Sequence, residues 1–105
     1  DCAMDLIRSI FEKEVGEKTT RNMMKALQDM LSQASKHRYL SGENTNLVAS
    51  AFAFRMSKQV NPRSRLKSKI CNTLGIKTNR FDRLEGQYSN VLNQIFKSCW
   101  SKGGI

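Results

Sequence analysis

Apolar side chains recur along this chain at intervals of three and four residues, and a single proline, Pro62, interrupts the pattern. This spacing places the apolar side chains on one face of an α-helix, because an α-helix has 3.6 residues per turn. Proline removes a backbone donor and blocks a helix interior, so one proline leaves room for long helices. The pattern therefore predicts an all-α fold, a compact five-helix bundle.

Turn and capping residues divide this pattern into five predicted helices. Thr19 or Thr20 is expected to cap the second helix, and Gly75 to end the fourth. Asn61 is expected to cap the fourth helix with Pro62 at its first position, where the missing N–H costs nothing. The length suits one domain. The prediction is one domain, 1–105, with helices over about 2–15, 20–37, 45–60, 62–74 and 79–100.

Charge is the second constraint on this chain. Lys and Arg number 18 against 9 acidic residues, which gives a net charge of +9. The surplus is uneven, because the chain from residue 55 to residue 80 contains eight basic residues and no acidic one. A field of this sign attracts polyanions and acidic protein surfaces. The eight basic residues are Arg55, Lys58, Arg63, Arg65, Lys67, Lys69, Lys77 and Arg80.

Six of these cations form the predicted contact surface, at the junction of the third and fourth predicted helices. Arg63 and Arg65 fall in the first turn of the fourth predicted helix, where positive charge opposes the helix dipole by a few tenths of a kcal/mol. A role other than stability would explain them there. A solvated, solubilising face is the alternative, and the sequence leaves it open. The six residues are Arg55, Lys58, Arg63, Arg65, Lys67 and Lys69.

The residue inventory argues against catalysis. The one histidine, His37, stands between Lys36 and Arg38 at a predicted helix end, a poor setting for a buried general base. Glu12 and Glu14 alternate with lysine, as on a solvated helix face. The chain has no glycine-rich phosphate loop and no Cys or His spacing typical of zinc sites. We therefore predict no enzyme, no cofactor, no metal and no small-molecule substrate.

Three cysteines leave two interpretations open. Cys2, Cys71 and Cys99 are buried reduced thiols on helical faces, or a disulfide joins Cys99 to Cys2 or to Cys71. The odd number would leave one thiol outside any such bridge.

No apolar run approaches the roughly 18 residues that a membrane span requires, so no span is predicted.

Nucleic acid is an alternative partner for the basic run. The fourth predicted helix could enter a DNA groove, but the turn before it lacks the glycine usual in helix-turn-helix motifs. Single-strand binding needs aromatic side chains among the cations, and residues 55–80 contain none. Contact with phosphates, without reading of the bases, is therefore the most that this alternative predicts.

Three short segments carry a family resemblance. Phe11 to Gly16 has the pattern Phe-x-x-Glu-x-Gly, and Ala51 to Met56 has Ala-Phe-Ala-x-x-Met. Asn93 to Phe96, Asn-Gln-Ile-Phe, lies near the close of the last predicted helix. These segments resemble the ends of helix one, helix three and the last helix in the N-terminal domain of spider silk proteins, the spidroins. The resemblance extends over nearly the whole chain, but it rests on short motifs of mostly core residues.

The resemblance implies a secreted five-helix bundle with a role in self-association. Spidroin N-terminal domains are typically acidic or dipolar, carry a tryptophan in helix one, and dimerise as pH falls through glutamates on helices three to five. In this chain the corresponding places hold Lys58, Arg63 and Tyr88, and the first predicted helix has no tryptophan. The acid-triggered switch of the family therefore does not carry over.

The expected function combines the charge and the resemblance. We expect a secreted, basic helical module for assembly or protein interaction, of the kind found in silk or other extracellular structural material. Its expected partner is an acidic protein surface, or a second copy in a homodimer. The alternative is an intracellular domain that binds DNA or RNA phosphates through the face from Arg55 to Arg80.

Overall fold

The computed structural model describes the backbone of residues 2–102 and the side chains of residues 3–100. The described chain folds into helices joined by short turns and loops, without a β-strand, which confirms the all-α prediction. Its extents of 34 × 29 × 27 Å are nearly equal, as in a compact globule. The elements are α1 (Cys2–Val15), α2 (Glu17–Lys36), the 3-10 helix η1 (Leu40–Gly42), α3 (Thr45–Val60), α4 (Lys67–Thr73) and α5 (Thr78–Lys102).

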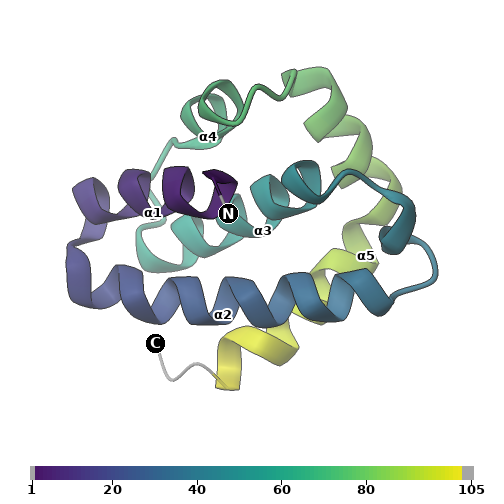
Figure 1. Cartoon of the computed structure of the whole chain (residues 1–105), viewed down its shortest axis with the longest axis horizontal. Helices are drawn as coiled ribbons and strands as arrows, with labels where there is room; N and C mark the ends of the chain where they lie inside the picture. The colour runs from purple at the N-terminus through teal and green to yellow at the C-terminus, as the bar shows by residue number, and fades with distance from the viewer. Residues whose placement is uncertain (1, 103–105) are drawn as a thin grey trace.

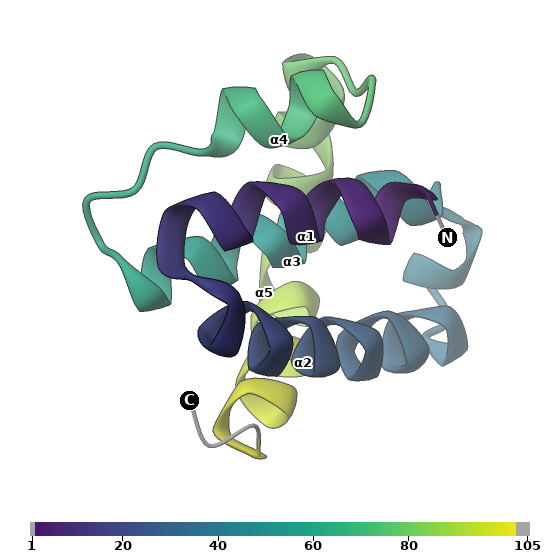
Figure 2. The same cartoon turned by 60° about the vertical axis from the view of Figure 1, so that its left-hand side comes forward.

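The helices surround α3. α1 and α2 lie side by side in opposite directions, and α5 crosses behind α2 (Figure 1). α4 lies on the other side of α1 and α3 from α2, as the turned view makes clear (Figure 2). α3 packs against each of the other four α-helices. It is therefore the central helix of the bundle.

Small side chains explain how α3 can be enclosed. Alanines and serines along α3 are buried, and they let neighbouring helices approach closely. Phe52 and Met56 fill the remaining space and are fully buried. The buried hydroxyls of Ser50 and Ser57 donate to the carbonyls of Leu47 and Phe54, at 2.6 and 2.7 Å, so enclosure leaves neither hydroxyl without a partner.

The start of α2 differs from the prediction. α2 begins at Glu17, and its N-cap is Gly16 in the left-handed region, with φ 87°. The predicted cap at Thr19 or Thr20 is wrong, because both residues lie inside the helix. The hydroxyl of Thr20 instead donates to the carbonyl of Gly16 at 2.7 Å. Gly16 reverses the chain in one residue, so that α2 follows α1 directly.

The start of α4 is a larger correction, because the helix begins at Lys67 and not at Pro62. Asn61 closes α3 by donating its N–H to the carbonyl of Ser57 at 2.9 Å. Its own carbonyl accepts from the N–H of Ser64 at 2.8 Å, which makes 61–64 a turn with Asn first and Pro second. Arg63 and Arg65 therefore stand in a loop, so their predicted place in the first turn of the fourth helix is wrong.

α5 is bent, where the sequence predicted one continuous stripe from 79 to 100. Tyr88 has non-helical backbone angles, φ −123° and ψ 22°, two residues after Gly86. Glycine weakens a helix interior, and kinks commonly form near such positions. Both halves of the helix keep apolar contacts with the core, through residues such as Leu84 and Leu92. The bend therefore keeps a 25-residue helix on the surface of a small globule.

Gly75 ends α4 in a Schellman motif and provides a test of the backbone. Its φ is +69°, and the N–H of Ile76 donates to the carbonyl of Cys71 at 2.8 Å. We expect Gly75→Ala to lower the free energy of unfolding by about 1–2 kcal/mol, because an L side chain is strained at this φ. Gly42→Ala is the matched control, since a Cβ there also meets open space but the φ is ordinary. Equal urea midpoints for the two variants would contradict this account.

Candidate interaction surface

The fold divides the eight cations of the acid-free run into two groups. Arg55, Lys58 and Lys67 are held by contacts inside the molecule. The other five side chains are exposed, and among the described residues none of them makes an ion pair or a side-chain hydrogen bond. We call these five the cationic edge: Arg63, Arg65, Lys69, Lys77 and Arg80.

Arg55 joins α3 to α5. Its guanidinium group binds both carboxylate oxygens of Glu85, with Nη2 at 2.8 Å from Oε1. Its Nε donates to Asn93 Oδ1 at 2.9 Å. The two charged side chains are only 12% and 24% exposed. A bidentate pair of this kind is geometrically specific. Although Arg55 was predicted to belong to the contact surface, most of its donors are occupied inside the fold.

Lys58 and Lys67 are also anchored. Lys58 Nζ donates to the carbonyl of Ser64 and lies 5.7 Å from the centre of the Phe54 ring. These contacts tie the loop after α3 back to that helix. Lys67 Nζ lies 2.5 Å from Asp82 Oδ1, an ion pair that connects α4 to α5. Both lysines therefore act first as connectors of the fold, although both keep part of their surface exposed.

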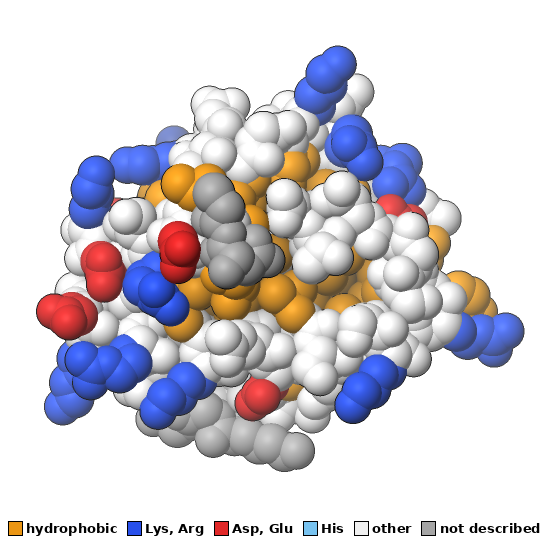
Figure 3. All heavy atoms as spheres, in the orientation of Figure 1, with side chains coloured by type: hydrophobic (Ala, Val, Ile, Leu, Met, Phe, Trp, Pro, Cys, Tyr) orange, Lys and Arg blue, Asp and Glu red, His pale blue; other side chains and the backbone are white. Residues whose placement is uncertain are grey.

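The cationic edge lies along one border of the fold. Arg63 and Arg65 are in the loop before α4, Lys69 is on α4, and Lys77 and Arg80 are at the start of α5. α4 contacts α5, so the turn at residue 75 connects the part of this border on α4 to the part at the start of α5. In Figure 3, basic side chains project at both ends of this border, near the loop before α4 and at the start of α5, with mostly uncharged side chains between them.

Acidic residues do not offset the cationic edge. The sequence has no Asp or Glu from residue 44 to residue 81. Asp82 follows directly, but its carboxylate is bound by Lys67. Lys77 and Arg80 were outside the six predicted residues, although both belong to the acid-free run that predicted the surface. Three of the six predicted residues thus lie on the edge, and the turn at residue 75 adds two more.

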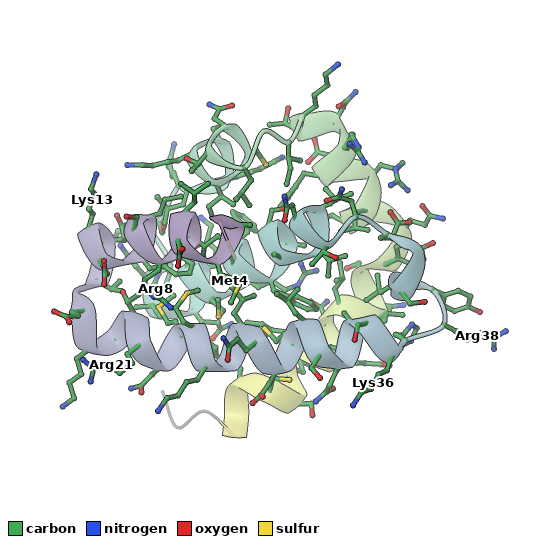
Figure 4. All side chains as sticks on the ribbon, viewed as in Figure 1. Met4, Arg8, Lys13, Arg21, Lys36 and Arg38 are labelled. Carbon is green, nitrogen blue, oxygen red and sulfur yellow. The ribbon has the colours of Figure 1, made fainter. Side chains whose placement is uncertain are left out.

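An aromatic cluster lies elsewhere, where sequence reasoning did not find it. Tyr39 is 51% exposed and stacks on Tyr88 with ring centres 6.2 Å apart. The guanidinium of Arg38 lies 5.1 Å from the centre of the Tyr39 ring, and Arg38 extends from the end of α2 (Figure 4). No sequence signal links Tyr39 to Tyr88, because the bend in α5 brings them together. The ring of Tyr39 is thus already in contact with its own chain.

The cysteines are only partly described. Cys71 is a buried free thiol, so it forms no bridge to Cys99, which is also buried. The side chain of Cys2 lies outside the described residues, and with it the predicted pairing of Cys2 and Cys99. Burial raises the pKa of the Cys71 thiol, the charge of Lys67 lowers it, and that of Asp82 raises it.

Within the described residues, no three His, Cys, Asp or Glu side chains are grouped so that they could hold a metal ion. None of the helices in the described part is long and apolar enough to cross a membrane. Comparison of the chain with protein-family models, curated proteins and solved structures yields no match.

Arg55 and Arg63 provide a direct test of the division between internal and exposed cations. We expect Arg55→Met to lower the free energy of unfolding by about 2–3 kcal/mol, because Glu85 is left without its partner. Removing one partner of a fully buried ion pair costs about 3–5 kcal/mol, and the loss expected here is smaller because Glu85 keeps some contact with water. Adding Glu85→Leu should restore most of it. Arg63→Met, the control, should change urea stability by no more than about 0.5 kcal/mol. A similar loss in both single variants would refute the division.

Cys71 provides a test of burial by its reactivity. Only the thiolate is nucleophilic, so a raised pKa and burial both slow alkylation. We expect iodoacetamide at pH 8 to modify Cys71 far more slowly in the folded protein than in concentrated urea, measured by peptide mass spectrometry. The pKa of the Cys71 thiol is raised in the folded state. The contribution of this thiol to the free energy of unfolding is therefore fully present below its ordinary pKa of 9.0 and is lost as the pH rises through the raised pKa. Equal labelling rates in both states would show that the thiol is accessible.

Proposed function

We propose that this chain is an assembly or protein-interaction module that binds an acidic protein surface through the cationic edge. The observation that carries the proposal is a group of five exposed cations for which the described residues supply no acidic partner. The other three cations of the acid-free run, Arg55, Lys58 and Lys67, are held by the fold itself. The loop before α4, α4 and the start of α5 up to residue 81 therefore carry exposed cations and no acid of their own.

The chemistry of the edge suits carboxylates. Arg63, Arg65 and Arg80 are arginines, and a guanidinium group binds a carboxylate through two parallel hydrogen bonds. Exposed charges of this kind contribute more to association rate and specificity than to affinity. They act over about 8 Å at physiological ionic strength. Binding should therefore weaken as salt is added.

Charge also favours an acidic partner over a second copy at this border. Each copy carries a net charge of +9, and two cationic edges brought together would repel each other. The resemblance to spidroin N-terminal domains supports a secreted module of silk type or another extracellular structural material. In such a material the partner would be an acidic domain, since the acid-triggered pairing of the family does not carry over.

Binding of DNA or RNA phosphates is the alternative for the same cations. Charge alone supports it, because no aromatic residue stands between Arg63 and Arg80 to stack on bases. Phosphate binding would also have a steep dependence on salt, with a slope set by the number of contacts. The two functions are therefore best distinguished by comparing an acidic polypeptide with a nucleic acid as the bound probe, and not by the salt dependence of binding.

The test is a triple charge reversal, Arg63→Glu with Arg65→Glu and Lys69→Glu. We expect it to weaken binding of poly-L-glutamate by about tenfold or more, equivalent to about 1.4 kcal/mol. Helicity and melting temperature should be nearly unchanged, because the three side chains are exposed. Fluorescence anisotropy at several salt concentrations measures the binding.

The matched control reverses three exposed lysines of α1 and α2, Lys13, Lys18 and Lys25, with the same change in net charge. Lys13 projects from the end of α1 into solvent (Figure 4). The control should keep its affinity within about threefold, or about 0.7 kcal/mol. Equal losses in both variants would mean that net charge alone attracts the probe, and the edge would be only solubilising. Tighter binding of duplex DNA than of poly-L-glutamate at equal salt would favour the alternative.

A further inference from the structure

A groove opens between α3 and α5, next to the cationic edge. Its volume is about 430 Å³, and the rings of Phe54 and Phe96 form its apolar walls. Ligand pockets commonly run from about 300 to 1,000 Å³. The groove is at the small end of that range and suits one large side chain better than a whole partner helix.

The walls of the groove are held in place by other aromatic rings. Phe54 meets Phe81 edge to face, with ring centres 5.7 Å apart. Phe96 stacks on Trp100 with ring centres 5.4 Å apart. Contacts of this kind fix ring orientation, so little conformational freedom remains to be lost when a ligand enters. The groove is therefore largely preorganised.

The polar lining excludes a cationic occupant. Arg55, Lys58 and Lys97 line the groove with a single acid, Glu85. Both oxygens of Glu85 are already bound by Arg55. A lysine or arginine from a partner would find no carboxylate to pair with. An apolar side chain flanked by acidic residues fits both the walls and the charge.

One contact links the groove to the cationic edge. Lys58, which lines the groove, donates from Nζ to the carbonyl of Ser64. Ser64 stands between Arg63 and Arg65 in the loop before α4. An extended chain advances about 3.3 Å per residue, so acids within a few residues of a side chain in the groove can reach that loop.

From these observations we infer that the groove receives one aromatic or large aliphatic side chain of the acidic partner. The partner's recognition element is then a short acidic segment with a single apolar anchor. This inference rests on the proposed function, because the acidic residues of the segment bind the cationic edge. The groove adds selectivity that charge alone does not give.

The test uses two labelled acidic peptides that are identical except for a central Phe or Ala. We expect the Phe peptide to bind the full chain about tenfold more tightly, a difference of about 1.4 kcal/mol. Trp100 is the only tryptophan of the chain, and its stacking on Phe96 makes its fluorescence a second measurement. The Phe peptide should change the Trp100 emission, whereas the Ala peptide should leave it nearly unchanged.

A plug in the groove tests the location. Gln59 lines the groove and is exposed, so Gln59→Trp should obstruct the groove without disturbing the core. We expect this variant to bind both peptides with the affinity that the wild type has for the Ala peptide. Gln33→Trp, at an exposed position on α2, is the matched control and should keep the tenfold preference. Gln59→Tyr replaces the first plug if the tryptophan lowers the melting temperature.

The outcomes separate the inference from the proposed function. Equal affinity of the wild type for both peptides would overturn the anchor and leave the cationic edge intact. A preference for Phe that survives both plugs would overturn the assignment to the groove. Failure of both peptides to bind would overturn the proposed function and the inference together.

Discussion

Enclosure of α3 is the constraint on which the rest of the structure depends. Because α3 contacts each of the other α-helices, any charged residue on it must find a partner inside the fold or reach the surface. Arg55 does the first, through Glu85 and Asn93 of α5. Lys58 is partly exposed, and its ammonium group donates to the loop carbonyl of Ser64. The packing of one helix thus decides which cations remain available to a partner.

The scarcity of acids then determines where the excess charge lies. Of the three acids after residue 31, Glu43 pairs with Arg83, Asp82 with Lys67, and Glu85 with Arg55. Each of these acids is therefore engaged within the fold. The cations of the loop before α4 and the start of α5 are left without partners in the described part of the chain. A stable monomer has no need of such a group, and an acidic partner would give it a role.

Local pattern was enough to predict much of this fold. The apolar spacing and the turn residues placed α1 and α3 at the observed residues, because each helix has an unbroken apolar face and clear ends. The starts of α2 and α4 were wrong for one physical reason. Thr20 and Asn61 each had the side chain for a cap, but hydrogen bonds to Gly16 and within the 61–64 turn used those groups otherwise. Propensity identifies capping residues, whereas the path of the chain decides which of them caps.

Only part of the candidate site could be predicted from the sequence. A run without acids pointed to the part of the chain that carries the cationic edge, but pairing across 30 residues, as between Arg55 and Glu85, has no local signature. The groove was invisible for the same reason, since its two walls come from α3 and α5. Burial adds a further consequence for Arg55. A cation that looked like part of the contact surface instead neutralises Glu85 and so makes the groove unsuitable for a basic side chain. In the proposed interaction, Arg55 would therefore contribute to partner selection indirectly, by occupying the carboxylate that a basic segment would need.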